Sequence, residues 1–464
     1  MMGFVDRFYK KMPVIAQHGL VSLYGGYRYW LRFGPGYRAA CQSFRQRMGY
    51  DASQWQEWQR QQCQQLLTMA AQQVPYYEQT WTKPEKRAAQ AGYLSEIPLL
   101  EKDAVRANPR LFLRQDQQPR RHLTFHTSGS TGTPIATIWT VPEVRASLAV
   151  REVRSAGWAG VSFKMARATF SGRLIEPDPH SVGPFYRYNV VERQAYLSPF
   201  HLRPDTAAAY VNALKKHSIE WLTGYAVSAY LLARFILENN IPPLKLKAVI
   251  TTSEKVTSEM RRMMEAAYGC RVYEEYGTVE NVLFASECEY GRLHLSPDIG
   301  IVEIVRPDGS PCLLHEVGEV VVTGLMRRYQ PFIRYRLGDL AAWDDPTCAC
   351  GRQMPIIKEV VGRVEDVVVG PDGRQMVRFH GVFIDQPHVQ EGQIIQEAVN
   401  RIRVKVVANN GFGLADVQSI VERVQQRLGC QVEVVVESVN AIPRTANGKF
   451  QAVICQIPPE KRPV

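Results

Sequence analysis

The hydrophobic pattern of the first hundred residues is typical of helices. Apolar side chains recur at helical spacing in residues 55–74, for example, and Pro and Gly residues interrupt the pattern at intervals. The sequence therefore predicts a helical segment ahead of any sheet.

From about residue 220, short apolar runs alternate with segments of helical periodicity. The runs predict strands at residues 221–225, 247–252 and 271–275, and the periodic segments predict helices at residues 228–239 and 258–268. Such alternation is typical of a parallel sheet, whose ligand site lies beyond the carboxyl ends of its strands.

The pattern changes again from Gly300. Residues 301–305 and 319–323 flank the turn-rich segment 306–310, which predicts antiparallel strands. After residue 362, alternation of strand and helix patterns predicts a compact α+β unit, with strands at 402–407 and 431–437 around a helix at 414–428.

We therefore expect an α/β fold with two domains. Residues 1–362 form a large N-terminal domain of parallel and mixed sheets with helices plus a β-structured subdomain, and residues 363–464 form a small α+β C-terminal domain. The chain length of 464 residues agrees, because it is too long for one ordinary core. The boundary is predicted near residues 363–366.

Composition narrows the class of protein. The chain is 45% hydrophobic and 22% charged, as globular proteins are, and no stretch is long and apolar enough to cross a membrane. The basic and aromatic N-terminus lacks the apolar core of a secretory signal, so we expect a cytoplasmic protein. Nine cysteines in such a chain favour thiols or a metal site over a disulfide framework.

The net charge of +11 has three interpretations. A nucleic-acid partner is disfavoured, because the bases are scattered and no Lys/Arg run carries interleaved aromatics. We favour a basic surface that attracts anionic substrates such as ATP. Peripheral contact with an anionic membrane leaflet is the most that we expect of a membrane partner.

The strongest local motif is a run of small residues after residues 123–125. Hydroxyl donors alternate with glycines that let the backbone approach a bulky anion; the run comprises Thr127, Ser128, Gly129, Ser130, Thr131, Gly132 and Thr133. The alternative is a flexible linker, but apolar residues on both sides predict a strand–loop–strand context. It is not a Walker A loop, because no Gly-Lys-Ser/Thr follows at the required spacing.

Three weaker motifs follow. Tyr276 and Glu280 stand at the end of a predicted strand, where a ring can stack on a base and a carboxylate can reach a divalent cation. Asp339, after a predicted Gly turn, can accept both hydroxyls of a ribose. Lys449 ends a polar loop near the C-terminus. Taken singly, each is as readily explained as a solvated strand end, a surface turn or an exposed lysine.

In this order the motifs resemble the signature series of the acyl-adenylate-forming superfamily, which includes acyl-CoA synthetases, luciferases and the adenylation domains of peptide synthetases. The resemblance spans roughly residue 120 to the C-terminus. Within the superfamily, segments 331–339, 350–355 and 393–396 are similar to the phenylacetate–CoA ligase branch, and particularly to CapK-like proteins associated with capsular and surface polysaccharide biosynthesis.

The resemblance implies a reaction and a set of roles. It implies ATP-dependent adenylation of a carboxylic acid, then acyl transfer to CoA, a carrier protein or a sugar, with a mobile C-terminal domain. Residues 127–133 would contact the ATP phosphates, Thr131 and Glu280 would serve Mg²⁺, and Lys449 would be the catalytic lysine. The remaining implied nucleotide contacts are Ser253, Glu254, Glu275, Tyr276, Gly277, Thr278, Asp339 and Arg363, and the implied hinge residues are Glu365 and Asp366.

One residue departs from the family pattern. Many relatives have a lysine after the proline of the phosphate loop, whereas Ile135 follows Pro134 here. Phosphate neutralisation then depends on hydroxyls, backbone N–H groups and the metal. Two alternatives to the ligase therefore stay open: a protein of the same fold that binds without catalysis, and an enzyme that leaves AMP on its acceptor.

A Cys/His set predicts a separate metal site. Cys348 and Cys350 form one pair, and Cys288 with His294 forms a second. Four such ligands in two short pairs can build a closed tetrahedral Zn²⁺ site with a structural role. The alternative is reduced cysteines and a core histidine. Four other cysteines are predicted to be buried apolar positions: Cys270, Cys312, Cys430 and Cys455.

Overall fold

The computed structural model describes most of the chain. It covers residue 9 and residues 12–126, 135–173, 175–176, 178, 180–254, 256, 258–306, 308–361, 368–373, 375–376, 380–383, 386–408, 410–443 and 453–457.

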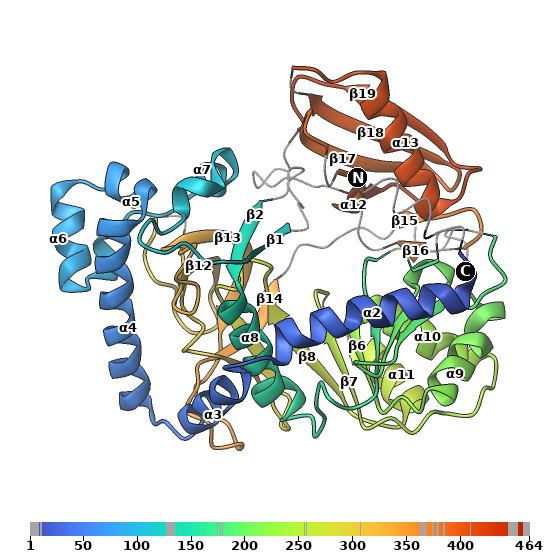
Figure 1. Ribbon diagram of the computed structural model, residues 1–464, viewed down its shortest axis with the longest axis horizontal. Coiled ribbons are helices and arrows are strands. Elements are labelled where there is room, and N and C mark those ends of the chain that lie inside the picture. Colours follow the sequence, from blue (N-terminus) through green and yellow to red (C-terminus); the bar gives the residue numbers. More distant parts are fainter. Residues whose placement is uncertain are drawn as a thin grey trace.

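The N-terminal part is helical, as its pattern predicts (Figure 1). The segment predicted at residues 55–74 is α4, which begins one residue after Asp51. Asp51 accepts from the Gln54 amide at 2.8 Å and Gln54 accepts from the Asp51 amide at 3.0 Å, a capping box that fixes the start of the helix. The helices of this part are α2 (Val14–Phe33), α3 (Tyr37–Arg47), α4 (Ala52–Gln73), α5 (Pro75–Thr80), α6 (Lys83–Ala91) and α7 (Lys102–Ala107).

A 12-stranded mixed sheet forms the body of the molecule, in the order β11-β12-β13-β14-β10-β9-β8-β7-β6-β3-β5-β4. Strands β5, β3, β6, β7 and β8 are parallel neighbours, which confirms the predicted parallel sheet. Their bounds, with those of edge strand β4, are β3 (Arg167–Phe170), β4 (Tyr186–Asn189), β5 (Gln194–Leu197), β6 (Trp221–Tyr225), β7 (Ala248–Thr252) and β8 (Val272–Gly277).

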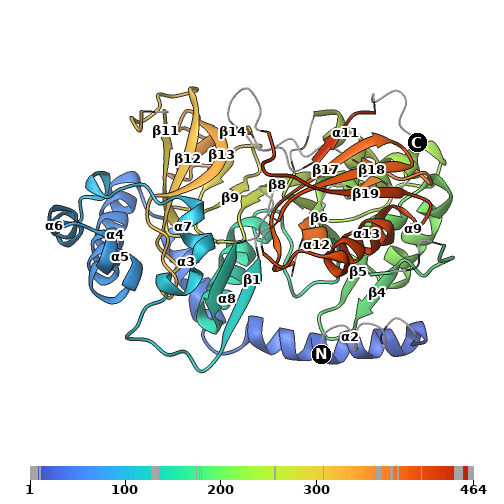
Figure 2. The same ribbon diagram turned by 90° about the horizontal axis from the view of Figure 1, so that it is seen from above.

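Helices cover this parallel part of the sheet (Figures 1 and 2). Large apolar side chains of β6 and β7 meet those of α10 and α11 in one buried cluster. The predicted helices are confirmed to within two residues at each end. The helices here are α9 (Ala207–Lys216), α10 (Ala226–Glu238) and α11 (Ser258–Tyr268).

The other half of the sheet is antiparallel, as predicted from residue 300 onward. It curls away from the parallel half and packs against α4 to α6 through a second apolar cluster. Its strands are β9 (Phe284–Glu287), β10 (Leu293–Leu295), β11 (Gly300–Val305), β12 (Val317–Gly324), β13 (Tyr335–Trp343) and β14 (Ile356–Val361).

A two-stranded hairpin stands apart from both halves. Strands β1 (His122–His126) and β2 (Ala136–Thr140) pair antiparallel, and α8 (Val141–Val150) follows β2 directly. Thr140 begins this helix with a capping box to Glu143. A π-helical turn, Arg151–Ala156, continues the helix.

The C-terminal residues build a separate small sheet, in the order β19-β18-β17-β20, seen in red at the top of Figure 1. The core includes Ile394, Val404 and Val424, and Phe200 of the larger unit also packs into it. The predicted α+β character is confirmed. The elements are β15 (Val368–Val369), β16 (Gln375–Met376), α12 (His380–Phe383), β17 (Val389–Ala398), β18 (Arg401–Ala408), α13 (Leu414–Leu428), β19 (Glu433–Ser438) and β20 (Val453–Cys455).

A buried ion cluster ties the helices to the sheet. Asp298, in the connection between β10 and β11, accepts from Arg154 at 2.5 and 2.8 Å and from Arg47 of α3 at 2.7 Å. The side chains of Asp298 and Arg154 have no exposed surface. Burial raises the pKa of the Asp298 carboxyl, but the two guanidinium groups lower it further, to below its ordinary value.

We expect Asp298→Asn to lower the free energy of unfolding by about 3–5 kcal/mol, because it leaves Arg154 buried without a counter-charge. Since the pKa of Asp298 is depressed in the folded protein, its stabilisation is present above an unfolded pKa of about 3.9 and is lost only as the pH falls through the folded value. Urea unfolding at neutral pH measures the change. The matched control is Glu57→Gln, which breaks the exposed Glu57–Arg60 pair and should leave the midpoint of urea unfolding almost unchanged. Equal losses of stability in the two variants would contradict the role given to the buried Asp298 cluster.

Candidate functional site

Several predicted site residues lie outside the described residues. These are the loop residues 127–134, Arg363, Glu365, Asp366 and Lys449. The frame of the loop is described: β1 ends at His126 directly opposite Ala136, the first residue of β2. The two predicted strands on either side of the motif are therefore confirmed.

The ends of β7 and β8 lie side by side, because the two strands are parallel neighbours with Thr252 opposite Glu275. Ser253 and Glu254 follow β7, and Gly277 and Thr278 lie at and just after the end of β8. The predicted adenine border and the Tyr276 motif thus share one edge of the sheet, as the topology of parallel strands requires.

Two carboxylates at this edge already have protein partners. Glu254 accepts from the Val227 amide in the first turn of α10 at 2.8 Å. Glu275 is buried and pairs with Arg151 at 2.5 Å. These contacts fix the shape of the strand ends.

Tyr276 and Asp339 are brought together from motifs 63 residues apart: the Tyr276 hydroxyl donates to Asp339 Oδ2 at 2.8 Å. Their strands, β8 and β13, are separated by β9, β10 and β14. Four strand spacings in a flat sheet amount to roughly 19 Å, which is more than the two side chains can span. The hydrogen bond therefore requires the curl of the antiparallel half.

The backbone at Asp339 is not the predicted Gly turn but part of a strand. Gly338 and Asp339 lie within β13, at a shift in its register with β12 between Glu319 and Val321. Gly338 has a φ of 73°, which glycine adopts at little cost. The Arg-Leu-Gly-Asp segment is thus a β-bulge, a device that re-aims a side chain next to a functional site.

Glu280 is held on a short segment after β8. It is 5% exposed, and its Oε1 accepts from the buried Tyr335 hydroxyl at 3.1 Å. Tyr335 is the first residue of β13, so this second cross-link repeats the approach of β13 to the end of β8. Glu280 and Asp339 are therefore both positioned by pairs between the same two parts of the sheet.

Arg327 is a central residue that the sequence analysis missed. It is fully buried, and its guanidinium donates to the Ile138 carbonyl at 2.6 Å and to the Glu280 carbonyl at 3.2 Å. Its guanidinium carbon also lies 4.5 Å from the Trp139 ring centroid. Burial lowers the pKa of Arg327 to about 10, so the side chain stays cationic at neutral pH. One side chain thus joins the loop hairpin to the Glu280 segment.

Neighbouring polar side chains complete this attachment. Gln330 accepts from the Ile138 amide at 2.7 Å, so both backbone groups of Ile138 are bonded to side chains. Glu143 accepts from the Arg328 and Tyr329 amides at 3.0 and 3.1 Å. No feature of the local sequence pattern marks Arg327 or Gln330, because their partners are distant in the chain.

Ile135 occupies a core position. It is 2% exposed and belongs to the apolar cluster that packs against α4 to α6. The position that holds lysine in many relatives therefore contributes apolar packing at the base of the hairpin.

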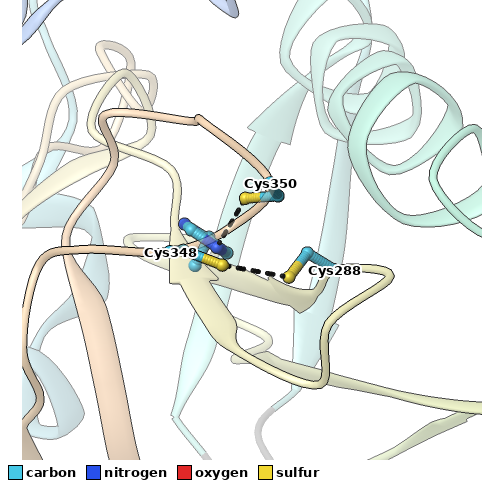
Figure 3. A group of neighbouring side chains, drawn as sticks. Cys288, Cys348 and Cys350 are labelled. Carbon is cyan, nitrogen blue, oxygen red and sulfur yellow. Dashed lines mark hydrogen bonds between the residues drawn. The ribbon is translucent and has the colours of Figure 1, made fainter.

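The four predicted metal ligands converge (Figure 3). One ligand atom from each of Cys288, His294, Cys348 and Cys350 lies within 4.8 Å of all the others. Cys288 and His294 come from β9–β10 and the two other cysteines from the loop between β13 and β14. Cys288 Sγ lies 3.7 Å from Cys348 Sγ, and Cys350 Sγ lies 3.3 Å from His294 Nε2.

These separations fit a tetrahedral metal site. Bonds of about 2.3 Å to sulfur and 2.0–2.1 Å to nitrogen place two sulfurs roughly 3.8 Å apart and a sulfur and a nitrogen roughly 3.6 Å apart. Burial lowers the pKa of His294 to about 4, which keeps its imidazole neutral, the form that binds metals. The Tyr290 amide donates to Cys288 Sγ at 3.4 Å, a contact that orients this ligand.

The prediction for the remaining cysteines is confirmed only in part. Cys312 is buried, Cys270 and Cys455 are half-buried, and Cys430 is exposed. The prediction was wrong for Cys430 because it lies in the turn between α13 and β19, outside the apolar face of the helix.

The fold defined by these elements is that of the acyl-adenylate-forming CoA ligases. A 2-hydroxyisobutyryl–CoA ligase in complex with 2-HIB-AMP and CoA superposes with a TM-score of 0.56 and 20% identity, over 88% of this chain and 92% of the ligase. The same ligase in its postadenylation state gives a TM-score of 0.54. At this identity the likeness concerns the fold alone.

Over its full length the chain is similar to a CapK protein. It is 25% identical to protein CapK of Staphylococcus aureus over 468 residues, which is 98% of this chain and all of CapK. A family model described as the CapK C-terminal domain matches residues 373–456. The phenylacetate–coenzyme A ligase of Thermus thermophilus is 28% identical over 148 residues, 30% of this chain and 33% of the ligase. The chain is thus a homologue of adenylate-forming CoA ligases.

We expect Arg327→Met to lower the free energy of unfolding by about 3 kcal/mol, since it leaves Glu143 and the Ile138 carbonyl without their buried cationic partner. Hydrogen exchange in peptides that cover β2 should quicken, because the hairpin loses its attachment to the Glu280 segment. The control is Arg328→Met, the same change at the half-buried neighbour whose side chain contacts Gln62. Unaltered exchange in β2 of the Arg327 variant would contradict this role.

Proposed function

We propose that the protein activates a small-molecule carboxylic acid with ATP, forming an acyl-AMP and releasing pyrophosphate, and then transfers the acyl group to an acceptor. The observation that carries this proposal is the Tyr276–Asp339 hydrogen bond of 2.8 Å. It joins an aromatic ring suited to stack on a base and a carboxylate suited to accept ribose hydroxyls, at the edge of the sheet where α/β folds bind nucleotides.

The proposed roles combine the positions of the described residues with the family resemblance. Asp339 binds the ribose, Tyr276 borders the adenine, and Glu280 is the carboxylate that binds Mg²⁺. Residues 127–133 contact the phosphates and Thr131 also serves the cation. The other contacts proposed from the family resemblance are Arg363 to the nucleotide, Glu365 and Asp366 as the hinge between residues 1–362 and 363–464, and Lys449 to the acid and the α-phosphate.

The chemistry concentrates negative charge around one phosphorus. The acid carboxylate attacks the α-phosphorus, a P–O bond forms, and the bond to pyrophosphate breaks. Fixed N–H and hydroxyl donors aimed at this charge stabilise the transition state, and a divalent cation supplies further charge stabilisation. Lys449 would add a point charge that a moving domain can bring and withdraw.

The acceptor is proposed by chemical class. The 2-hydroxyisobutyryl–CoA ligase of the same fold is described in complex with CoA, and part of the chain is similar to phenylacetate–coenzyme A ligases. We therefore propose a thiol such as CoA as the preferred acyl acceptor, and a carrier protein or a sugar as the next candidates. From the resemblance to CapK-like proteins we further propose a cytoplasmic role in surface polysaccharide biosynthesis.

We propose zinc as the occupant of the Cys/His cluster, because its three sulfurs and one imidazole form a closed four-ligand set. Such a set leaves no position for substrate, so the role is structural. It would join the β9–β10 hairpin to the loop before β14.

Adenylation is tested by acid-dependent exchange of labelled pyrophosphate into ATP across a panel of aryl, hydroxy and amino acids. With an active acid, Asp339→Ala should lower kcat/KM for ATP about ten- to hundredfold, since a buried hydrogen-bonding contact to substrate is lost. Asp308→Ala, in the exposed turn between β11 and β12, is the control. Lys449→Ala should abolish exchange while ATP still binds.

In parallel with the exchange assay, ATP binding is measured by calorimetry. ATP binding without exchange for any acid of the panel would favour a binding protein that has lost catalysis. Absence of ATP binding by the wild-type chain would overturn the proposal.

For the metal, elemental analysis of protein purified without chelator should give one zinc per chain. The double variant Cys348→Ser, Cys350→Ser should lose the metal and unfold at a lower temperature, since binding energy at a structural site is folding energy. The control is Cys430→Ser, which changes an exposed cysteine outside the cluster. This variant should retain both the metal and the unfolding temperature of the wild type. Wild-type protein free of zinc, and stable in chelator, would exclude the structural site.

A further inference from the structure

Helix α2 directs its polar side chains toward the protein and its apolar side chains toward solvent, the opposite of an ordinary surface helix. It lies along one side of the large sheet, beside edge strand β4 (Figure 2). Its polar side chains face the protein: Gln17 accepts from buried Arg187 at 2.5 Å, and Arg32 pairs with buried Glu192 at 2.8 Å. A surface helix normally directs such residues to solvent.

The inward polar face caps the edge of the sheet. His18 Nδ1 accepts from the Tyr188 amide at 2.9 Å, and Ser22 Oγ accepts from the Val190 amide at 3.1 Å. These contacts satisfy donors that an edge strand leaves unpaired. Gly25 lets the helix approach closely, because a Cβ there would lie 2.2 Å from the Asn189 side chain. The helix is therefore fixed in its rotation about its own axis.

The outward face is apolar and aromatic. Leu23 is 77% and Trp30 51% exposed. The exposed large side chains of the helix are Ile15, Leu20, Leu23, Tyr24, Tyr27 and Trp30. They recur at helical spacing, and α2 has no Asp or Glu. A continuous exposed apolar strip of this kind marks an interaction surface rather than scattered apolar residues.

The surrounding sequence is strongly basic. Residues 7–50 contain eight Lys or Arg and no Asp or Glu. Among described residues near the strip, the Arg145 guanidinium lies 5.4 Å from the Trp30 ring centroid. The strip thus combines exposed Leu and Ile, an aromatic set of Tyr and Trp, and a sequence setting rich in Lys and Arg, of which Arg32 and Arg47 are paired with Glu192 and Asp298 on the protein side.

We propose that the exposed face of α2 binds the interface of an anionic lipid bilayer, with the helix parallel to the membrane plane. Leu and Ile would enter the acyl boundary, Tyr and Trp suit the headgroup level, and the cations attract anionic lipid. Among the described helices none is long and apolar enough to span a membrane; the polar side of α2 is bonded to β4, so α2 can only lie on the surface.

Charge favours lipid over a second copy of the chain. A two-fold contact through α2 would place the same acid-free, basic segment against itself, which like-charge repulsion opposes. An anionic surface is complementary to that segment instead. The inference does not depend on the proposed enzymatic activity.

The test is co-sedimentation of the full chain with vesicles of phosphatidylcholine alone or mixed with phosphatidylglycerol. The wild-type protein should pellet with the anionic vesicles and be released by salt. Leu23→Ser with Trp30→Ser should lower the partition coefficient at least about tenfold. The control is Leu313→Ser with Leu314→Ser, which removes two exposed leucines (72% and 55%) from the β11–β12 connection and should bind as the wild type does.

Light scattering and circular dichroism accompany the assay. Each variant should remain folded, because the replaced side chains are exposed. Binding to neither vesicle type, or equal binding by the α2 variant, overturns the proposal. A wild-type dimer that the α2 changes dissociate, without vesicle binding, also overturns it and identifies a second copy as the partner.

Discussion

Arg327 is a fully buried cation, and the arrangement of the site follows from the need to give it acceptors. An isolated guanidinium in an apolar interior costs several kcal/mol, so each of its contacts is strongly favoured over an alternative packing. Its acceptors come from the loop hairpin and from the segment that holds Glu280. Because a single buried side chain bonds both, the hairpin and the Glu280 backbone cannot move independently without leaving polar groups unpaired.

The curl of the mixed sheet imposes the second constraint. Two side-chain pairs, Tyr276–Asp339 and Tyr335–Glu280, bridge β8 or its following segment to β13. The Tyr276–Asp339 pair cannot form in a flat sheet, because three strands lie between β8 and β13. The bulge at Gly338 directs the Asp339 side chain once that curl has brought the strands together. The fold therefore positions Asp339 of β13 and Glu280 of the segment after β8 by side-chain pairs between the same two parts of the molecule.

Much of the fold could be predicted because its signals are local. The strand at 221–225 and the helix at 258–268 are found with those bounds, since apolar runs and helical periodicity act over a few residues. The convergence of the four Cys and His residues was also predictable, because each pair is close in sequence and such pairs commonly share a metal ion. Three features could not be predicted from the sequence, because each depends on partners brought together by the curvature of the sheet. They are the role of Arg327, the bulge at Gly338 and the Tyr276–Asp339 contact.

Helix α2 shows a further limit of pattern analysis. Periodicity identifies a helix with one apolar and one polar face but does not say which face is buried. Here the edge strand β4 decides, because its unpaired amides need acceptors that leucine and tryptophan cannot supply. Once His18 and Ser22 turn inward to meet those amides, the 3.6-residue period forces the apolar side chains outward. The exposed strip is thus the direct geometrical consequence of protecting the edge of the sheet, and it is this surface that we propose to bind lipid.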